Sequence, residues 1–436
     1  MKSKVYSSVE QFKEQNAELK TDLPISDDNS VLCQKVKIGN LELSNRLVCQ
    51  AMEGCDGTSD GRPDELTVRR YERLSKGGAG LIWFEATAVC NEGRANPRQL
   101  YINKKNLDDF KKIVENIKRW GMKENGYEPA VIMQATHSGR YSKPEGKPAP
   151  IIAYNNPIFE KDNPIDKSRI ITDEGLDRVH ESLVHAAGLA KEAGFDGVDI
   201  KCCHRYLNSE LLSAFTREGR YGGSFENRTR LLRESVRDSI SLCGDGFTVT
   251  SRMNVYDGFP YPYGFGVKEG EGITPDLSEA DRLIKELAEL GVKLLDITMG
   301  NPYFNPHVNR PYAAGGYEPP EHPLCGVARM LKGTAKLGKA NPDVSLICSG
   351  LSFLGAAAPG VAAAFIEEGG FSLAGFGRMI FAYPDFAKDI VNGRFDPKKI
   401  CIACSKCTEI MRAGGPPGCI VRDGETYMPI YKKYCK

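Results

Sequence analysis

The sequence predicts an α/β fold: a TIM (β/α)8 barrel with enlarged loops after its strands, followed by a short cysteine-rich C-terminal extension. Eight short apolar runs without clear polar alternation are spread evenly over residues 35–395, as expected for strands buried on both faces of a parallel sheet. Amphipathic segments lie between these runs, and several end at glycine, which is typical of a helix C-cap. Eight such β/α units favour a closed barrel, and an open doubly wound sheet is the alternative.

The predicted strands follow one another in chain order. They are RLVCQA (46–51), AGLIWFEA (79–86), AVIMQA (130–135), GVDI (197–200), FTVTSR (247–252), LLDIT (294–298), SLICSG (345–350) and SLAGFGR (372–378). The clearest helical patterns cover residues 65–77, 107–120, 176–194, 227–240, 278–291 and 356–370. Three segments that follow strands, 136–172, 253–277 and 299–322, are longer than ordinary connections and rich in Pro, Gly, Tyr and Asn. Because loops after the strands form the catalytic face of a TIM barrel, we expect these segments to line a pocket.

The two ends of the chain differ from the barrel in composition. Residues 1–34 are polar and charged, and we expect a lead-in with one helix that docks on the barrel of residues 35–395. Residues 396–436 contain four closely spaced cysteines and are expected to form the C-terminal extension.

Charge and hydropathy argue against several classes of protein. The 58 Lys and Arg residues nearly balance the 57 Asp and Glu residues, so no basic excess indicates nucleic acid or an anionic membrane as a partner. No apolar run approaches the roughly 18 residues of a transmembrane helix. The polar N-terminus lacks the apolar stretch of a secretory signal. We therefore expect a cytoplasmic protein without a membrane or nucleic-acid partner, and the sequence leaves open whether it forms a homo-oligomer.

Polar side chains and glycines follow most of the predicted strands at their carboxyl ends. They are Gln134 and His137 after the third strand, Lys201, His204 and Tyr206 after the fourth, Arg252 at the fifth, Ser349 and Gly350 at the seventh, and Gly377 and Arg378 at the eighth. Because the carboxyl ends of barrel strands share one face, we expect one site. Gly350, Gly377 and Arg378 suit a phosphate, since glycine lets backbone N–H groups approach and arginine offers two donors. Gln134 suits the edge of a heterocycle and Arg252 suits negative charge on it, so the set indicates flavin mononucleotide (FMN).

Four of the fourteen cysteines crowd near the end of the chain. Cys401, Cys404, Cys407 and Cys419 have the spacing C-x2-C-x2-C-x11-C. Three thiolates two residues apart wrap around one corner of a cubane cluster, and a distant fourth closes it. A zinc site is the alternative, although zinc sites more often pair two C-x2-C halves. The other cysteines are expected mainly to pack in the core or in loops.

Residues 36–425 resemble the Old Yellow Enzyme family of FMN-dependent NADH:flavin oxidoreductases. The segments that carry the resemblance are NRLVCQAMEGCDG with the following TSDGRPDELTVRRYERLSKGGAGLIWFEATAV, then QATHSGR, and DGVDIKCCHRYLNSELLSAFTREGRYGGSFENRTR. Their length and order make the resemblance specific, and it implies the same barrel with FMN at its mouth.

The resemblance also implies roles at matching positions. The implied cofactor-binding residues are Ala51, Met52, Glu53, Gln134, Arg252, Ser349, Gly350, Gly377 and Arg378. His204 would bind the electron-withdrawing group of the substrate, and Tyr206 would donate a proton.

Two positions depart from the family pattern. Lys201 stands where relatives have His, or Tyr in the amine-dehydrogenase branch. Its cation either polarises a carbonyl or pairs with a carboxylate of the substrate, or it points away and leaves His204 to act alone. Glu53 follows Ala51-Met52 where relatives have Thr or Cys after Pro-Met, and it either tunes the flavin, contacts the substrate or lies in a satisfied polar network.

The iron–sulfur branch of the family carries a four-cysteine motif just past the barrel. This branch includes 2,4-dienoyl-CoA reductase and trimethylamine dehydrogenase, so the resemblance implies a [4Fe-4S] cluster on Cys401, Cys404, Cys407 and Cys419, and the cluster indicates an anaerobic setting. Those relatives continue with a dinucleotide-binding region, whereas this sequence has no G-x-G-x-x-G after a strand. We expect electrons from a donor protein facing the cluster (a ferredoxin, flavodoxin or flavoprotein subunit), and direct hydride transfer from NAD(P)H is the alternative.

The leading functional prediction is an ene-reductase acting on a small molecule with a conjugated carbonyl. Hydride would pass from N5 of reduced FMN to the β-carbon, His204 and Lys201 would polarise the carbonyl, and Tyr206 would protonate the α-carbon. One alternative is an oxidative amine dehydrogenase or N-demethylase, with loop tyrosines such as Tyr303 around a cationic amine. The positive charge of Lys201 argues against that alternative. Another is an electron-transfer subunit, against which the His204 and Tyr206 pair argues.

Overall fold

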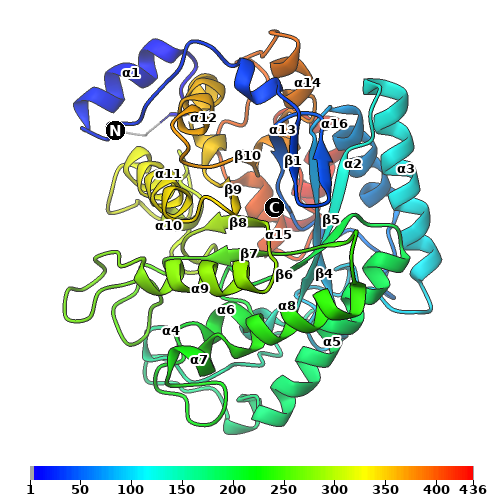
Figure 1. Cartoon of the computed structure of the whole chain (residues 1–436), viewed down its shortest axis with the longest axis vertical. Coiled ribbons are helices and arrows are strands. Elements are labelled where there is room, and N and C mark those ends of the chain that lie inside the picture. The colour runs from blue at the N-terminus through cyan, green and yellow to red at the C-terminus, as the bar shows by residue number, and fades with distance from the viewer. Residues whose placement is uncertain (1–3, 436) are drawn as a thin grey trace.

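The computed structural model describes residues 4–435 and confirms the predicted TIM barrel. Its parallel strands close in the order β10-β3-β4-β5-β6-β7-β8-β9, surrounded by helices (Figure 1). The strands are β3 (Leu47–Cys49), β4 (Leu81–Ala88), β5 (Ala130–Thr136), β6 (Gly197–Ile200), β7 (Thr248–Asn254), β8 (Leu294–Thr298), β9 (Ser345–Cys348) and β10 (Leu373–Phe376). Each strand coincides with one of the predicted apolar runs. Because β10 pairs with both β9 and β3, the barrel has no edge, and the open-sheet alternative is wrong.

Helices return the chain along the outside of the barrel to the start of the next strand. The longer ones are α2 (Glu65–Lys76), α3 (Leu107–Asn125), α5 (Asp173–Glu192), α8 (Arg230–Cys243), α9 (Ser278–Glu289), α11 (Pro323–Ala340) and α12 (Ala358–Glu367). The shorter ones are α4 (Pro157–Glu160), α6 (Leu207–Leu211), α7 (Phe225–Arg228), α10 (Pro306–Asn309), α13 (Met379–Ala382) and α14 (Phe386–Val391). In α9 the buried residues Ala280, Leu283, Ile284 and Leu287 share one face, which is the periodicity that predicts the helix. α11 lies outside the predicted helical segments.

A hairpin that the sequence pattern did not single out closes the amino-terminal end of the barrel. β1 (Val36–Ile38) pairs antiparallel with β2 (Leu41–Leu43) through a two-residue turn, in which Gly39 adopts a positive φ of 55°. Its apolar side chains form a core cluster with the first residues of several strands, Leu81 and Leu294 among them. This position places the hairpin opposite the face on which a TIM barrel carries its site.

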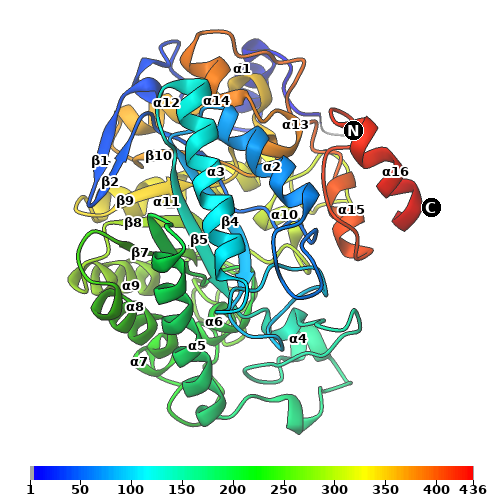
Figure 2. The same cartoon turned by 90° about the vertical axis from the view of Figure 1, so that its right-hand side faces the viewer.

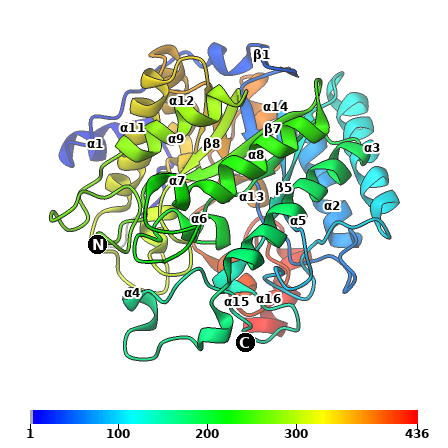
Figure 3. The same ribbon diagram turned by 60° about the horizontal axis from the view of Figure 1, so that its bottom comes forward.

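The two ends of the chain flank the barrel. α1 (Val9–Glu18) is the expected docking helix: Phe12 is fully buried and its ring meets that of Tyr6 at 5.6 Å. Residues 1–3 of the predicted lead-in lie outside the described residues. α15 (Lys406–Arg412) and α16 (Gly424–Cys435) lie together on the side of the barrel away from the β1–β2 hairpin (Figures 2 and 3). No helix between residues 4 and 435 is both long and apolar enough to span a membrane.

Candidate active site

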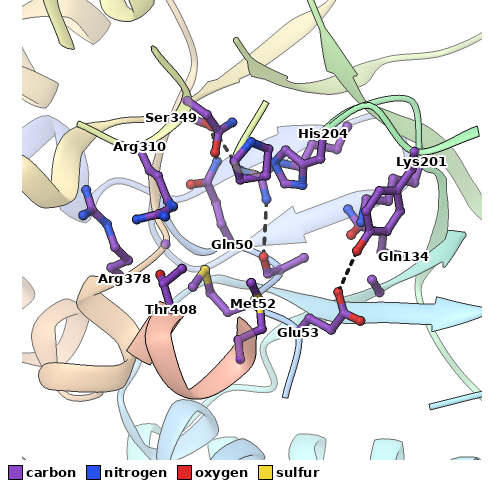
Figure 4. A pocket seen from close by; sticks show the side chains of 18 of the residues that line it. Gln50, Met52, Glu53, Gln134, Lys201, His204, Arg310, Ser349, Arg378 and Thr408 are labelled. Atoms are coloured by element: carbon purple, nitrogen blue, oxygen red, sulfur yellow. Dashed lines mark hydrogen bonds between the residues drawn. The ribbon is translucent and has the colours of Figure 1, made fainter. Parts of the chain in front are cut away.

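One pocket at the carboxyl ends of the barrel strands gathers the predicted flavin and substrate residues (Figure 4). It is lined by Ala51, Met52, Glu53, Gln134, Lys201, His204, Tyr206, Arg252, Ser349, Gly350, Gly377 and Arg378. These residues lie near the carboxyl ends of β3, β5, β6, β7, β9 and β10 or just after them, so the closed barrel brings together positions that are far apart in the chain.

The sequence pattern does not reveal all of the pocket lining. The additional residues are Gln50, Ala86, Pro302, Asn309, Arg310, Ser352, Thr408 and Met411, and Tyr303 is predicted only as a loop aromatic. Most come from the loop after β8 or from α15. Of the three enlarged loops, 299–322 lines the pocket as expected, whereas 136–172 and 253–277 contribute no lining residue, although Tyr141 of segment 136–172 stacks on the lining residue Tyr303. Those two loops pack on each other instead, with Asn156 donating a hydrogen bond from Nδ2 to the carbonyl oxygen of Tyr263 at 3.3 Å.

Asp199 in β6 fixes one wall of the pocket. Gln134 donates from Nε2 to its Oδ2 at 2.6 Å, and Trp83 donates to the same oxygen at 2.8 Å. The backbone N–H of Arg252 donates to Oδ1 at 2.7 Å. Burial raises the pKa of Asp199, and these hydrogen bonds oppose the rise. The Gln134 amide is therefore held at the pocket by a carboxylate that is itself locked in the barrel.

Asp296 in β8 fixes the neighbouring wall. Its Oδ2 lies 3.0 Å from Nε of Arg252, and Gln50 donates from Nε2 to Oδ1 at 2.8 Å. Gln50 also reaches Oγ of Ser349 at 2.7 Å. Burial raises the pKa of Asp296 to about 7, although the Arg252 charge opposes the rise. The Arg252 guanidinium is thus oriented at the pocket before any ligand arrives.

Two arginines lie together on the opposite side of the pocket. Arg378 follows β10 and donates from Nη2 to the carbonyl oxygen of Pro311 at 2.5 Å, while its buried Nη1 has no partner among the described residues. Burial lowers the pKa of Arg310, and the Arg378 charge lowers it further. Neither arginine forms a salt bridge within residues 4–435. Gly350 adopts a positive φ of 98°, which leaves its backbone free to approach a ligand. Two unpaired cations beside glycine backbone suit the phosphate of FMN, with Gln134 and Arg252 at its ring.

The predicted catalytic residues line the same cavity. Lys201 is 4% exposed, its Nζ lies 3.7 Å from the centre of the Tyr206 ring, and burial lowers its pKa. The structure therefore places Lys201 in the pocket rather than pointing away from it. His204 has a positive φ of 64°, and no hydrogen bond to another described residue holds its ring. Burial, followed by the charges of Arg252 and Lys201, lowers the pKa of His204, so its imidazole is neutral near pH 7.

Tyrosine hydroxyls form a chain at this end of the pocket. Tyr206 donates to Oε2 of Glu53 at 3.0 Å, and its oxygen lies 2.9 Å from the hydroxyl of Tyr303. The Tyr303 ring stacks on that of Tyr141 at 3.9 Å. Burial, followed by the charge of Glu53, raises the pKa of Tyr206 well above its ordinary value. Tyr206 is therefore protonated over the physiological range.

The four predicted metal ligands lie beside the arginine side of the pocket. Cys401, Cys404, Cys407 and Cys419 are free thiols, like the other cysteines. After burial and the opposing charge of Arg378, the charges of Cys407 and Cys419 contribute to the raised pKa of Cys401, so these sulfurs are near neighbours. Backbone N–H groups of Ala403 and Arg422 donate to Sγ of Cys401 and Cys419 at 3.4 and 3.3 Å.

Four cysteines are the kind of donor set that an iron–sulfur cluster uses, and the cluster itself stays a prediction. Such clusters take four cysteine thiolates whose sulfurs accept backbone hydrogen bonds. α15 carries Cys407, whose pKa is raised by burial and lowered by the nearby charges of Arg378 and Arg310, and its Thr408 and Met411 line the pocket. A group bound by these cysteines would therefore lie next to the candidate flavin site.

Comparison with known proteins gives the family. Residues 32–396 match the NADH:flavin oxidoreductase / NADH oxidase family. The NADPH dehydrogenase of Clostridium acetobutylicum is 28% identical over 267 residues, which are 60% of this chain and 72% of that protein. The NADH oxidase of Thermoanaerobacter brockii is 26% identical over 381 residues, 85% of this chain and 52% of that protein.

A solved structure shares the fold. A complex of 2-naphthoyl-CoA reductase with 2-naphthoyl-CoA is similar to this chain with a TM-score of 0.73 at 21% identity, over 94% of this chain and 58% of that one. The chain thus spans little more than half the length of that protein. With the family match covering most of the chain, the protein belongs to the NADH:flavin oxidoreductase / NADH oxidase family and is a flavin-dependent oxidoreductase.

Proposed function

We propose that this enzyme is an FMN-dependent ene-reductase that reduces the C=C bond of an α,β-unsaturated carbonyl compound. The observation that carries the proposal is the convergence of Lys201, His204 and Tyr206 on the pocket that holds the candidate flavin residues. When bound, reduced FMN supplies the hydride for the β-carbon. Gln134 and Arg252 would hold its ring, and Arg310 and Arg378 its phosphate.

The remaining steps belong to the protein side chains. The neutral imidazole of His204 donates a hydrogen bond to the carbonyl oxygen, and the nearby cation of Lys201 stabilises the negative charge that develops there. Tyr206, which is protonated, gives its proton to the α-carbon. Proton transfer by a positioned acid of this kind typically contributes about 10²–10⁴-fold to the rate.

Charge at the pocket supports a carbonyl or anionic substrate. Arg252, Arg310 and Arg378 would face FMN, which leaves Lys201 as the lining cation on the substrate side of the pocket. A cationic amine would meet this positive field, which disfavours amine oxidation. The stack of Tyr303 on Tyr141 is the observation that favours the second candidate, an amine dehydrogenase, because aromatic faces bind cations.

A [4Fe-4S] cluster on Cys401, Cys404, Cys407 and Cys419 is part of the proposal. Its supply of electrons to FMN is supported by α15, which carries Cys407 and lines the pocket through Thr408. Ile402 and Val421, next to the cysteines, are 42% and 45% exposed, so this region reaches the surface. We propose NAD(P)H as the direct hydride donor, with a ferredoxin, flavodoxin or flavoprotein subunit as the alternative donor through the cluster.

Anaerobic stopped-flow absorbance tests the function. Flavin- and cluster-loaded protein is first mixed with NADPH, NADH or dithionite, and the reduced protein is then mixed with an enone, an enoate or an enoyl thioester. The proposal predicts that at least one activated alkene restores the flavin absorbance. Bleaching of oxidised protein by a secondary or tertiary amine, without reoxidation by any alkene, would support the second candidate instead. Reduction by dithionite but not by NADPH or NADH would indicate a protein donor.

A further inference from the structure

The carboxyl group of Glu53 has an unusual environment at the mouth of the barrel. Its Oε2 accepts the hydroxyl of Tyr206 at 3.0 Å, the bond marked at Glu53 in Figure 4. Its Oε1 is buried and has no partner among the described residues. The backbone next to Glu53 is fixed as well, because the N–H of Gly54 donates a hydrogen bond to Oε2 of Glu85 at 2.6 Å. Glu53 therefore does not lie in a satisfied polar network, and one of its oxygens is left for a proton or a ligand.

The hydroxyl of Tyr206 has only one proton to donate. While Glu53 is ionised, that proton is engaged by its carboxylate, and Tyr206 can accept only from Tyr303, 2.9 Å away. If Glu53 is protonated, the direction reverses: Glu53 donates to the oxygen of Tyr206, and the phenolic proton is free for a substrate. The protonation state of Glu53 thus decides whether Tyr206 can act as an acid.

The environment of Glu53 shifts its pKa upward, towards the protonated form. Burial raises the pKa of Glu53, and the charge of Lys201 and the hydroxyl of Tyr206 oppose this rise without cancelling it. Tyr303 and Cys55, the other titratable neighbours, have raised pKa values for the same reason and bring no positive charge. A phenolate on the buried Tyr206 beside an ionised Glu53 would put two anions 3.0 Å apart.

We propose that Glu53 is the proton reservoir of the pocket and reprotonates Tyr206 as Tyr206 protonates the substrate. This inference rests on the proposed ene reduction. The O–H bond of Tyr206 breaks and its proton joins the α-carbon, while the O–H bond of Glu53 breaks and its proton joins the oxygen of Tyr206. The electron pair of the new C–H bond at the β-carbon comes with the hydride, and the π electron pair of the broken C=C bond forms the new C–H bond at the α-carbon. Glu53 ends as a carboxylate stabilised by Lys201, and solvent returns its proton after product leaves.

Infrared difference spectroscopy tests the proton on Glu53 without turnover. The FMN-loaded parent protein is compared with Glu53→Gln at pH 7, and the carbonyl-stretch band of a neutral carboxylic acid is the signal. The proposal predicts a band in the parent protein that Glu53→Gln lacks and that disappears from the parent as pH rises. Matching spectra in the acid-carbonyl region would mean that Glu53 is ionised and would overturn the proposal.

Single-turnover reoxidation of the reduced flavin by an enone tests the relay. Glutamine keeps the shape and a hydrogen-bond donor but has no transferable proton. Glu53→Gln should therefore slow reoxidation by roughly 10- to 100-fold. The reoxidation rate of the parent protein should fall as pH rises, and this pH dependence should be absent from Glu53→Gln. Glu53→Asp should recover part of the rate, and Glu92→Gln, a change of an exposed acid outside the pocket, should have the parent rate. The rate is measured on FMN-loaded protein, and FMN content and the rate of flavin reduction are measured for each variant, so that a loss of cofactor is distinguished from a loss of proton transfer.

The two proposals fail in different ways. Reoxidation of Glu53→Gln at the parent rate and with the parent pH profile would overturn the relay. If no enone, enoate or enoyl thioester reoxidises the parent protein, the proposed function is wrong, and the infrared band still decides whether Glu53 holds a proton.

Discussion

Two walls of the same pocket are built in different ways. The wall on the barrel strands is held by hydrogen bonds between strand residues, such as those from Gln134 to Asp199 and from Gln50 to Asp296. The wall on the C-terminal extension is held by contacts between distant segments, such as Asn96 Nδ2 to the carbonyl oxygen of Gly414 at 3.3 Å. The barrel therefore positions the first wall by folding alone, whereas the second depends on docking and on the proposed cluster.

Loss of the proposed cluster should have the largest effect, and it should affect the wall on the C-terminal extension while leaving the strand wall intact. Cys404→Ala removes one of four proposed ligands, so we expect iron and acid-labile sulfide to be lost while the barrel stays folded. FMN should remain bound through Gln134, Arg252 and Arg378. Iron analysis and the flavin absorbance of the purified variant measure both effects, and Cys33→Ala, outside the extension, is the matched control. An iron content equal to that of the parent would refute the cluster assignment.

Removing a charge from the strand wall should destabilise the barrel itself. Arg252→Ala leaves the buried Asp296 without its cation, and breaking a buried pair from one side typically costs about 3–5 kcal/mol. The free energy of unfolding from urea titration, together with FMN content, measures the change. Asp296→Asn, introduced into Arg252→Ala, should restore part of the stability. A decrease in the free energy of unfolding no larger than that expected for a solvent-exposed ion pair would contradict the role of this network in stability.

Acid should destabilise the barrel beside the pocket through His137, which directly follows β5 and is not among the residues that line the pocket. Burial lowers its pKa from 6.5 to about 4, so the folded ring stays neutral while the unfolded chain takes up a proton. The stability of the parent protein should therefore fall as pH drops from 6.5 towards 4, by at most about 3 kcal/mol from this group. The difference in unfolding free energy between the parent and His137→Gln should shrink over the same range. A pH-independent difference would show that the ring is not held neutral.

The smallest effect is expected where the extension meets α2. Asp423 is buried and pairs with Arg69 at 2.8 Å and with Arg73, but the side chains of both arginines are about a third or more exposed. Because solvent screens such pairs, Asp423→Asn should cost about 1 kcal/mol or less. Hydrogen exchange should quicken in α15 and α16 and stay unchanged in β5. Equal quickening in both regions would mean that the extension and the barrel open as one unit.

The strand wall is the part that the sequence could predict. Short buried runs fix the strands, and the polar residues at their ends, such as Gln134 and Arg252, must share one face once the barrel closes. The hairpin of β1 and β2 was overlooked although its alternating apolar residues and Gly39 turn are local signals.

The other wall could not be predicted in the same way. Arg310 and Tyr303 lie in a long loop whose course depends on tertiary contacts, and nothing local shows that Thr408 reaches the pocket. Composition was equally misleading for residues 136–172, which resemble a pocket loop but pack against a neighbouring loop. The unpaired oxygen of Glu53 likewise became visible only once Tyr206 and Tyr303 were placed beside it.

The most direct test of the proposed ene reduction is the effect of Tyr206→Phe on single-turnover reoxidation of the reduced flavin by an enone. Phenylalanine keeps the ring beside Lys201 and removes only the hydroxyl that would supply the proton. We predict reoxidation slowed by about 10²-fold or more, with FMN bound and flavin reduction at the parent rate. Reoxidation at the parent rate would show that Tyr206 does not protonate the substrate.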